Sequence, residues 1–188
     1  MLTEDDLLAP TVAYGIHPLV TVDERGVALL DGTVLAIAPH DHVAGAERLA
    51  VGVCSIGTAV DARAAELLAA RRSRLALALD IIANWALARL FDQVWGRLAR
   101  VARRAGLRLG CPLEPGVDGF ALSEQASLLR LADAQALGFF ATTTGMVGPG
   151  RTVTFAAGMG RNLPVWDPAD RCRRCGSRDY CKQAGRLR

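Results

Sequence analysis

The most informative stretch of this chain is Leu49-Ala50-Val51-Gly52-Val53-Cys54-Ser55-Ile56-Gly57, a nearly continuous apolar run that ends at a glycine. An apolar run of this length, bounded by a turn residue, predicts a buried β-strand. The alanine-rich sequence from Thr58 to Ala70 predicts that a helix follows at once. The flanking sequence must then supply partner strands on one side and further helix on the other.

A second, longer helix is predicted between residues 75 and 104. Apolar side chains recur there at steps of three and four residues, at Ile81, Trp85, Leu87, Leu90, Phe91, Val94, Leu98 and Val101. This spacing is typical of an amphipathic helix, and we expect Trp85 and Trp95 in the core. At 1.5 Å per residue the helix is roughly 45 Å long, so a break near Asn84 is an alternative. Gly106 is the expected C-cap.

Strands are predicted on both sides of these helices. Asp31-Gly32 lies between two apolar runs, residues 27–30 and 33–37, and favours a β-hairpin. Ser123 is expected to cap a helix that ends at Leu131. Two further strands, residues 139–143 and 152–157, are expected to be joined by a glycine-rich loop and to bury one face. Strands, then helices, then strands again predict an α+β fold, with an antiparallel or mixed β-sheet packed against long helices.

The composition is that of a globular protein. The chain has 188 residues, of which 51% are hydrophobic and 22% charged, which fits a single domain over residues 1–165 followed by a tail, residues 166–188. No run of about 20 apolar residues predicts a membrane span. The start of the chain is acidic, unlike a secretory leader, so a cytoplasmic location is expected. The net charge of +3 comes largely from arginines in residues 89–108 and in the tail, which suit a solvated helix face, phosphate or an acidic partner.

The tail is rich in cysteine and arginine. Cys172 and Cys175 form a C-x2-C pair, and Cys181 follows. Two thiolates at this spacing can reach one metal ion or cluster, so the tail is predicted to bind metal. A fourth ligand has to come from elsewhere in the chain. Cys54, in an apolar strand, is more simply interpreted as a buried thiol.

Several local patterns occur in an order that resembles relatives of the activation domain of cobalamin-dependent methionine synthase. The strand and glycine of residues 49–57 lead to a helix with Leu79-Asp80, and a Pro115-Gly116 loop precedes an aromatic residue and a glutamine. A strand–loop–strand with Thr, Met and Pro follows in residues 142–153. The resemblance covers approximately residues 48–181, and stand-alone members of this family often add a cysteine-rich tail.

The resemblance implies a fold and a function. The family's domain binds S-adenosylmethionine in a shallow groove and docks over a corrinoid, where reduction and methylation restore the active cofactor. Its signature is an arginine, three residues and Gly-Tyr. Here Arg108 would stand for the arginine and Pro115-Gly116-Val117 for the end of the motif, although Arg108 and Gly116 are eight positions apart and Val117 replaces the tyrosine. The expected partner is a corrinoid protein; a nucleic-acid or membrane partner is not expected.

The same resemblance favours a [4Fe-4S] cluster in the tail, because reduction of cobalt needs an electron donor. Cys111, which precedes a proline in the binding loop, would join Cys172, Cys175 and Cys181 as the fourth ligand. Zinc, completed by a histidine or Cys54, is the alternative. Two other functions stay open at this point: an iron–sulfur electron carrier or maturation factor without a methyl donor, and a zinc-stabilised binding protein.

Overall fold

The structure is a computed structural model, and it describes residues 7–39, 41–117, 119–164 and 166. It has an α+β fold with a six-stranded sheet in the order β3-β2-β1-β4-β8-β5 and a separate two-stranded sheet, β6-β7. All strand pairs are antiparallel. The predicted fold class is therefore confirmed. The described part of the chain contains no helix that is long and apolar enough to cross a membrane.

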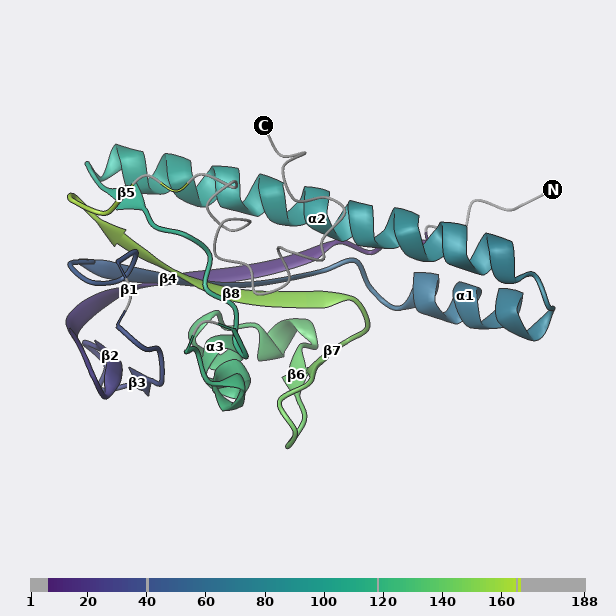
Figure 1. Cartoon of the computed structure of the whole chain (residues 1–188), viewed down its shortest axis with the longest axis horizontal. Helices are drawn as coiled ribbons and strands as arrows, with labels where there is room; N and C mark the ends of the chain where they lie inside the picture. The colour runs from purple at the N-terminus through teal and green to yellow at the C-terminus, as the bar shows by residue number, and fades with distance from the viewer. Residues whose placement is uncertain (1–6, 40, 118, 165, 167–188) are drawn as a thin grey trace, which may run out of the picture.

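The elements follow one another along the chain as strands, helices and strands. Their bounds are β1 Thr11–Asp23, β2 Gly26–Leu29, β3 Val34–Leu35, β4 Arg48–Ser55, α1 Ala59–Ala69, α2 Ser73–Arg104, β5 Arg108–Leu109, the 3-10 turn η1 Leu122–Glu124, α3 Gln125–Leu131, the 3-10 turn η2 Gln135–Leu137, β6 Phe140–Ala141, β7 Val147–Gly148 and β8 Thr152–Gly160. Figure 1 shows α2 lying along one face of the large sheet and α3 on the opposite side.

Strand β4 is the centre of the sheet. It pairs over its whole length with β1 and with β8, and all its residues after Arg48 are buried. The prediction of a buried strand at Leu49–Ile56 is thus confirmed. Gly52 lies opposite Phe155, and a Cβ at position 52 would collide with the Phe155 ring. The glycine therefore makes room for the aromatic ring in the core.

Strand β1 is the longest strand, and the sequence did not predict it. Gly15 and Pro18 interrupt its apolar pattern, and both are residues that usually weaken a strand. Position 15 requires glycine, because a Cβ there would collide with the Leu131 carbonyl oxygen and the His17 ring. Pro18 pairs with Arg48, the first residue of β4, and its carbonyl accepts a hydrogen bond from the Leu30 amide at 3.0 Å. Pro18 therefore stands where β1 changes partner from β4 to β2.

The hairpin at Asp31-Gly32 is confirmed. Strands β2 and β3 pair as Val27↔Leu35 and Ala28↔Val34. Gly32 has φ +86°, and the Asp31 carboxylate accepts a hydrogen bond from the Thr33 amide at 2.9 Å. The turn uses the positive φ that glycine tolerates and the local side-chain bond that aspartate provides.

Helix α2 runs without interruption for 32 residues, so the alternative of a break near Asn84 is wrong. Its C-terminal half packs on the sheet, where Phe91 and Trp95 contact the Phe155 ring edge-on at 5.2 and 5.9 Å between centroids. Gly106 follows the helix with φ +71°, as expected. Trp85 is 66% exposed, so its expected place in the core is wrong. Trp85 follows the buried Ala83 by two residues, which is roughly 200° around the helix, so its side chain lies on the outer side.

Two expectations for the C-terminal half need correction. The N-cap of α3 is Glu124, and Ser123 lies within the preceding 3-10 turn instead of capping the helix. The strand at 152–157 was expected to bury one face, but every residue of β8 from Thr154 onward is buried. It pairs with β4 in the large sheet, whereas β6 pairs with β7. Strand β8 is buried on both faces because α2 covers Phe155 and α3 covers Ala156.

Candidate functional site at the edge of strand β8

The first half of β8 has an open outer edge. Strand β5 pairs only with Met159 and Gly160, and Leu113 exchanges both main-chain bonds with Ala156. In an antiparallel strand alternate residues bond to the same side. Thr152 and Thr154 are in step with Ala156, so their amide and carbonyl groups face outward. No strand among the described residues pairs with them there.

A pocket of about 360 Å³ lies against this open edge, and we call it the β8-edge pocket. Helix α2 forms one wall and the segment before α3 forms another, while the loop between β6 and β8 closes the end. The lining residues are Asn84, Leu87, Glu114, Pro115, Leu122, Gln125, Gly145, Met146, Val147, Gly150, Arg151, Thr152, Val153 and Thr154. The pocket therefore joins segments that lie far apart in the sequence.

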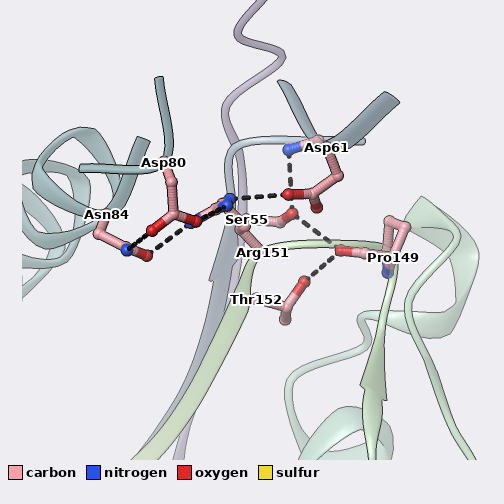
Figure 2. A network of polar contacts seen from close by, with 8 residues as sticks. Ser55, Asp61, Asp80, Asn84, Pro149, Arg151 and Thr152 are labelled. Atoms are coloured by element: carbon pink, nitrogen blue, oxygen red, sulfur yellow. Dashed lines mark hydrogen bonds and ion pairs between the residues drawn. The ribbon is translucent and has the colours of Figure 1, made fainter. Parts of the chain in front are cut away.

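Arg151 connects the pocket to both long helices. Its Nε donates to Asp61 Oδ1 at 2.9 Å, its Nη2 to Asp80 Oδ1 at 2.5 Å and its Nη1 to Asn84 Oδ1 at 2.6 Å (Figure 2). The Arg151 side chain is only 16% exposed. A guanidinium held by three side chains has little freedom to rotate. Arg151 thus fixes the start of β8 between α1 and α2.

The turn before Arg151 is also tied to the core sheet. The Pro149 carbonyl accepts hydrogen bonds from Ser55 Oγ at 3.2 Å and Thr152 Oγ1 at 2.6 Å (Figure 2). Gly150 has φ +50°, and a Cβ there would meet the Gly57 carbonyl oxygen at 2.8 Å. The close approach requires glycine. The turn at residues 149–151, which forms part of the pocket wall, is therefore held in one conformation.

The charges around Arg151 do not cancel. Asp61 and Asp80 supply two carboxylates for one guanidinium. Hydrogen bonding to Asp80, followed by that to Asp61, holds the pKa of Arg151 above its usual value, so the guanidinium stays charged. Among the described residues, this network therefore has one more carboxylate than guanidinium, which favours a cationic group nearby.

A buried hydrogen bond joins the floor of the pocket to α3. Thr154 Oγ1 donates to Gln125 Oε1 at 2.5 Å, and both side chains are at most 9% exposed. Gln125 is the glutamine that follows the Pro-Gly loop in the sequence pattern. Breaking such a buried bond would leave a polar group without a partner, so the two side chains are expected to keep this geometry. It fixes α3 relative to the open edge.

The predicted ligand-binding residues divide between two places. Pro115 lines the β8-edge pocket. Gly116 has φ +90° and donates its amide to the Phe120 carbonyl at 2.7 Å, and Val117 is 50% exposed; neither lines the pocket. Arg108 pairs with Gly160 at the far end of β8, roughly 25 Å along the strand from Val153. The ligand roles of Arg108, Gly116 and Val117 stay predictions.

The predicted metal site falls mostly on residues that are not described. Cys172, Cys175 and Cys181 lie outside the described residues, and Cys111 is buried at 5% exposure in the largest core cluster. Within the described ranges no group of three or more His, Cys, Asp or Glu side chains could hold a metal ion. Cys54 is fully buried, and burial raises the pKa of its thiol to about 12, which fits the interpretation as an inert core thiol.

Sequence reasoning missed the Arg151 network. Asp80 belongs to the Leu79-Asp80 pair of the family resemblance, and Arg151 to its strand–loop–strand, but neither was assigned a role. The four residues Asp61, Asp80, Asn84 and Arg151 are spread over 90 positions and have no common spacing. The only local signal was Asp80 and Asn84 at i and i+4, which places both on one helix face.

The fold is that of a known class of α+β domain. No protein-family model matches the chain, and no curated protein matches it either. Among solved structures, the crystal structure of the MetH reactivation domain bound to AdoHcy is similar, with a TM-score of 0.64 and 17% sequence identity. The match covers 98% of this chain and 68% of that chain. The chain therefore has the fold of a reactivation domain, as the sequence resemblance implied.

Proposed function

We propose that this protein is an accessory domain of cobalamin-dependent methyl transfer and that it binds S-adenosylmethionine in the β8-edge pocket. The observation that carries the proposal is the open strand edge inside this pocket, where Thr152 and Thr154 present main-chain donors and acceptors. The fold adds support, since the similar MetH reactivation domain binds AdoHcy.

The pocket suits a ligand with one apolar and one charged part. Its volume of about 360 Å³ lies in the usual range for small-molecule sites. Leu87, Leu122, Met146 and Val153 supply apolar surface for a nucleoside. The outward main-chain groups of Thr152 and Thr154 can bond to an amino-acid carboxylate and ammonium, as peptide edges do.

The charge balance favours the methylated form of the ligand. S-adenosylmethionine is a sulfonium cation, and when bound it supplies the methyl group for a reduced corrinoid of a partner protein. Among the described residues, Asp61 and Asp80 supply two carboxylates for the one guanidinium of Arg151 beside the pocket. They would attract the sulfonium and hold it in one position at the strand edge. The neutral demethylated product would then leave more readily.

The test is anaerobic incubation of the protein with a cobalt(II) corrinoid protein, a reductant and S-adenosylmethionine. Formation of methylcobalamin, measured by absorbance, is the expected result. Activity should require this protein and the methyl donor together. Absence of methylcobalamin with a corrinoid protein that is itself reducible would contradict the proposal.

The tail carries a second part of the proposal: residues 166–188 form a cysteine-rich segment that binds a [4Fe-4S] cluster. Its support is the C-x2-C pair Cys172 and Cys175 with Cys181, together with Cys111 in the segment that leads to the pocket. Thiolates are the usual ligands of such clusters. Anaerobically purified protein should absorb near ~400 nm and contain iron, whereas a colourless protein with zinc would favour the zinc alternative.

A further inference from the structure

A second pocket lies where α2 overhangs β1, and nothing in the proposed function uses it. It has a volume of about 220 Å³ and is lined by Tyr14, Arg97, Arg100, Val101 and Arg104; we call it the arginine pocket. Helix α2 packs across β4, β5 and β8, while β1 lies on the outer side of β4. The space between the helix and β1 is therefore open.

Three arginine side chains face this space. Arg97, Arg100 and Arg104 make no ion pair among the residues that the structure describes. Their spacing of three, four and seven residues puts them on one face of the helix, where like charges repel. If these arginines served only solubility, their side chains would be expected to spread apart, because this lowers the repulsion between them. These three instead line one hollow.

Two of the arginines are already oriented. Arg97 donates from Nε to the Tyr14 hydroxyl at 3.0 Å, and its guanidinium carbon lies 5.8 Å from the centre of the Tyr14 ring. Arg100 donates from Nε to the Gly96 carbonyl at 3.2 Å. In both arginines the Nε bonds to a neighbouring protein group, and the two Nη groups can donate a pair of hydrogen bonds to a ligand.

We infer that the arginine pocket binds a small molecule that carries a diphosphate or triphosphate group. Guanidinium forks match pairs of phosphate oxygens, and three of them compensate a multivalent anion better than a monovalent one. The volume of about 220 Å³ admits linked phosphates. This site is separate from the β8-edge pocket, because Arg97 is 13 residues, roughly 20 Å, along α2 from Asn84.

The test is titration of the whole protein with inorganic pyrophosphate and tripolyphosphate by calorimetry at constant low salt. We expect saturable one-to-one binding, at least tenfold tighter for tripolyphosphate than for orthophosphate. Arg104→Gln and Arg97→Gln should each weaken tripolyphosphate binding tenfold or more. Arg103→Gln is the matched control: Arg103 is the neighbour of Arg104, is also exposed and does not line the pocket. It should change the affinity less than twofold.

Other outcomes would overturn the inference. The inference would be wrong if neither polyphosphate bound saturably, or if Arg103→Gln and Arg104→Gln lost the same tripolyphosphate affinity. It would also be wrong if a short single-stranded oligonucleotide bound more tightly than tripolyphosphate. The melting temperature of each variant shows that it is folded. The Nε–H resonance of Arg97 in the 1H–15N spectrum gives a second readout, because a ligand at this site should shift it even if the heat of binding is small.

Discussion

Arg151 at the start of β8 donates from Nε to the carboxylate of Asp61 in the first turn of α1, 2.9 Å away and 90 positions earlier in the chain. The same guanidinium reaches Asp80 and Asn84 on α2. One side chain thus holds together the sheet, both long helices and one wall of the β8-edge pocket. The network is a polar link between the fold and the proposed binding site.

Replacing Arg151 should destabilise the protein. Arg151→Gln removes hydrogen bonds to two carboxylates from a side chain that is only 16% exposed, so we expect a loss of about 2–3 kcal/mol in the free energy of unfolding. Arg89→Gln is the control, since the Arg89–Asp92 pair at 3.4 Å is exposed on both sides. It should cost less than about 0.5 kcal/mol. Equal effects in urea denaturation would show that the Arg151 network is not structural.

Two glycines should respond in opposite directions to the same substitution. Gly52→Ala drives a methyl group into the Phe155 ring, and overpacking of this kind costs about 2 kcal/mol. Gly96→Ala lies in the exposed middle of α2 with nothing within 4 Å of the new methyl group, so it should gain roughly 0.5–1 kcal/mol. Thermal unfolding of both variants measures this. A stabilising Gly52→Ala would contradict the packing of β4 against β8.

The Cys54 thiol should be unreactive in the native state. Alkylation needs the thiolate, and burial raises the pKa of this thiol to about 12. Mass spectrometry at pH 8 should therefore find Cys54 alkylated only after unfolding. In the unfolded chain the thiol has a pKa of ~8.5, so below that pH its full contribution to the free energy of unfolding is present. Its contribution is lost as the pH rises from about 9 to 12, and a native Cys54 that reacts at pH 8 would be inconsistent with the structure.

The charge of the β8-edge pocket should distinguish two forms of one ligand. S-adenosylmethionine is a cation at sulfur, whereas S-adenosylhomocysteine is neutral there. We expect the first to bind more tightly, and Asp61→Asn to narrow the difference, with a change of about 0.5–1.5 kcal/mol in their relative affinity. Calorimetric titration of both ligands against both proteins measures it. Identical preferences in wild type and variant would show that the Asp61 carboxylate does not influence the choice of ligand.

Local patterns in the sequence predicted the elements that local chemistry controls. The apolar run that became β4, the helical period of α2 and the Asp31-Gly32 turn all depend on residues close together in the chain. Strand β1 escaped prediction because Gly15 and Pro18 are accommodated by neighbours from other elements, namely Leu131 and Leu30. Trp85 was misplaced because the apolar residue Ile81, four positions earlier, made that side of α2 look like core, and both side chains are exposed.

The candidate site was less predictable than the fold. Pro115 and Gln125 were noticed as parts of a pattern, and both line the pocket. The Arg151 network and the open edge at Thr152 and Thr154 depend on which strands pair, and the sequence patterns assigned no partner to β8. Strand pairing is non-local, so short motifs alone do not determine it.

The most direct test of the central claim is a 1H–15N spectrum of the protein during titration with S-adenosylmethionine. We expect saturable shifts of the Thr152 and Thr154 amides, which face the open edge, and of the loop amides at Gly145 and Met146. The Gly52 amide in the buried sheet should stay unchanged. Saturation without shifts at Thr152 and Thr154, or no binding at all, would contradict the claim that this strand edge is the binding site.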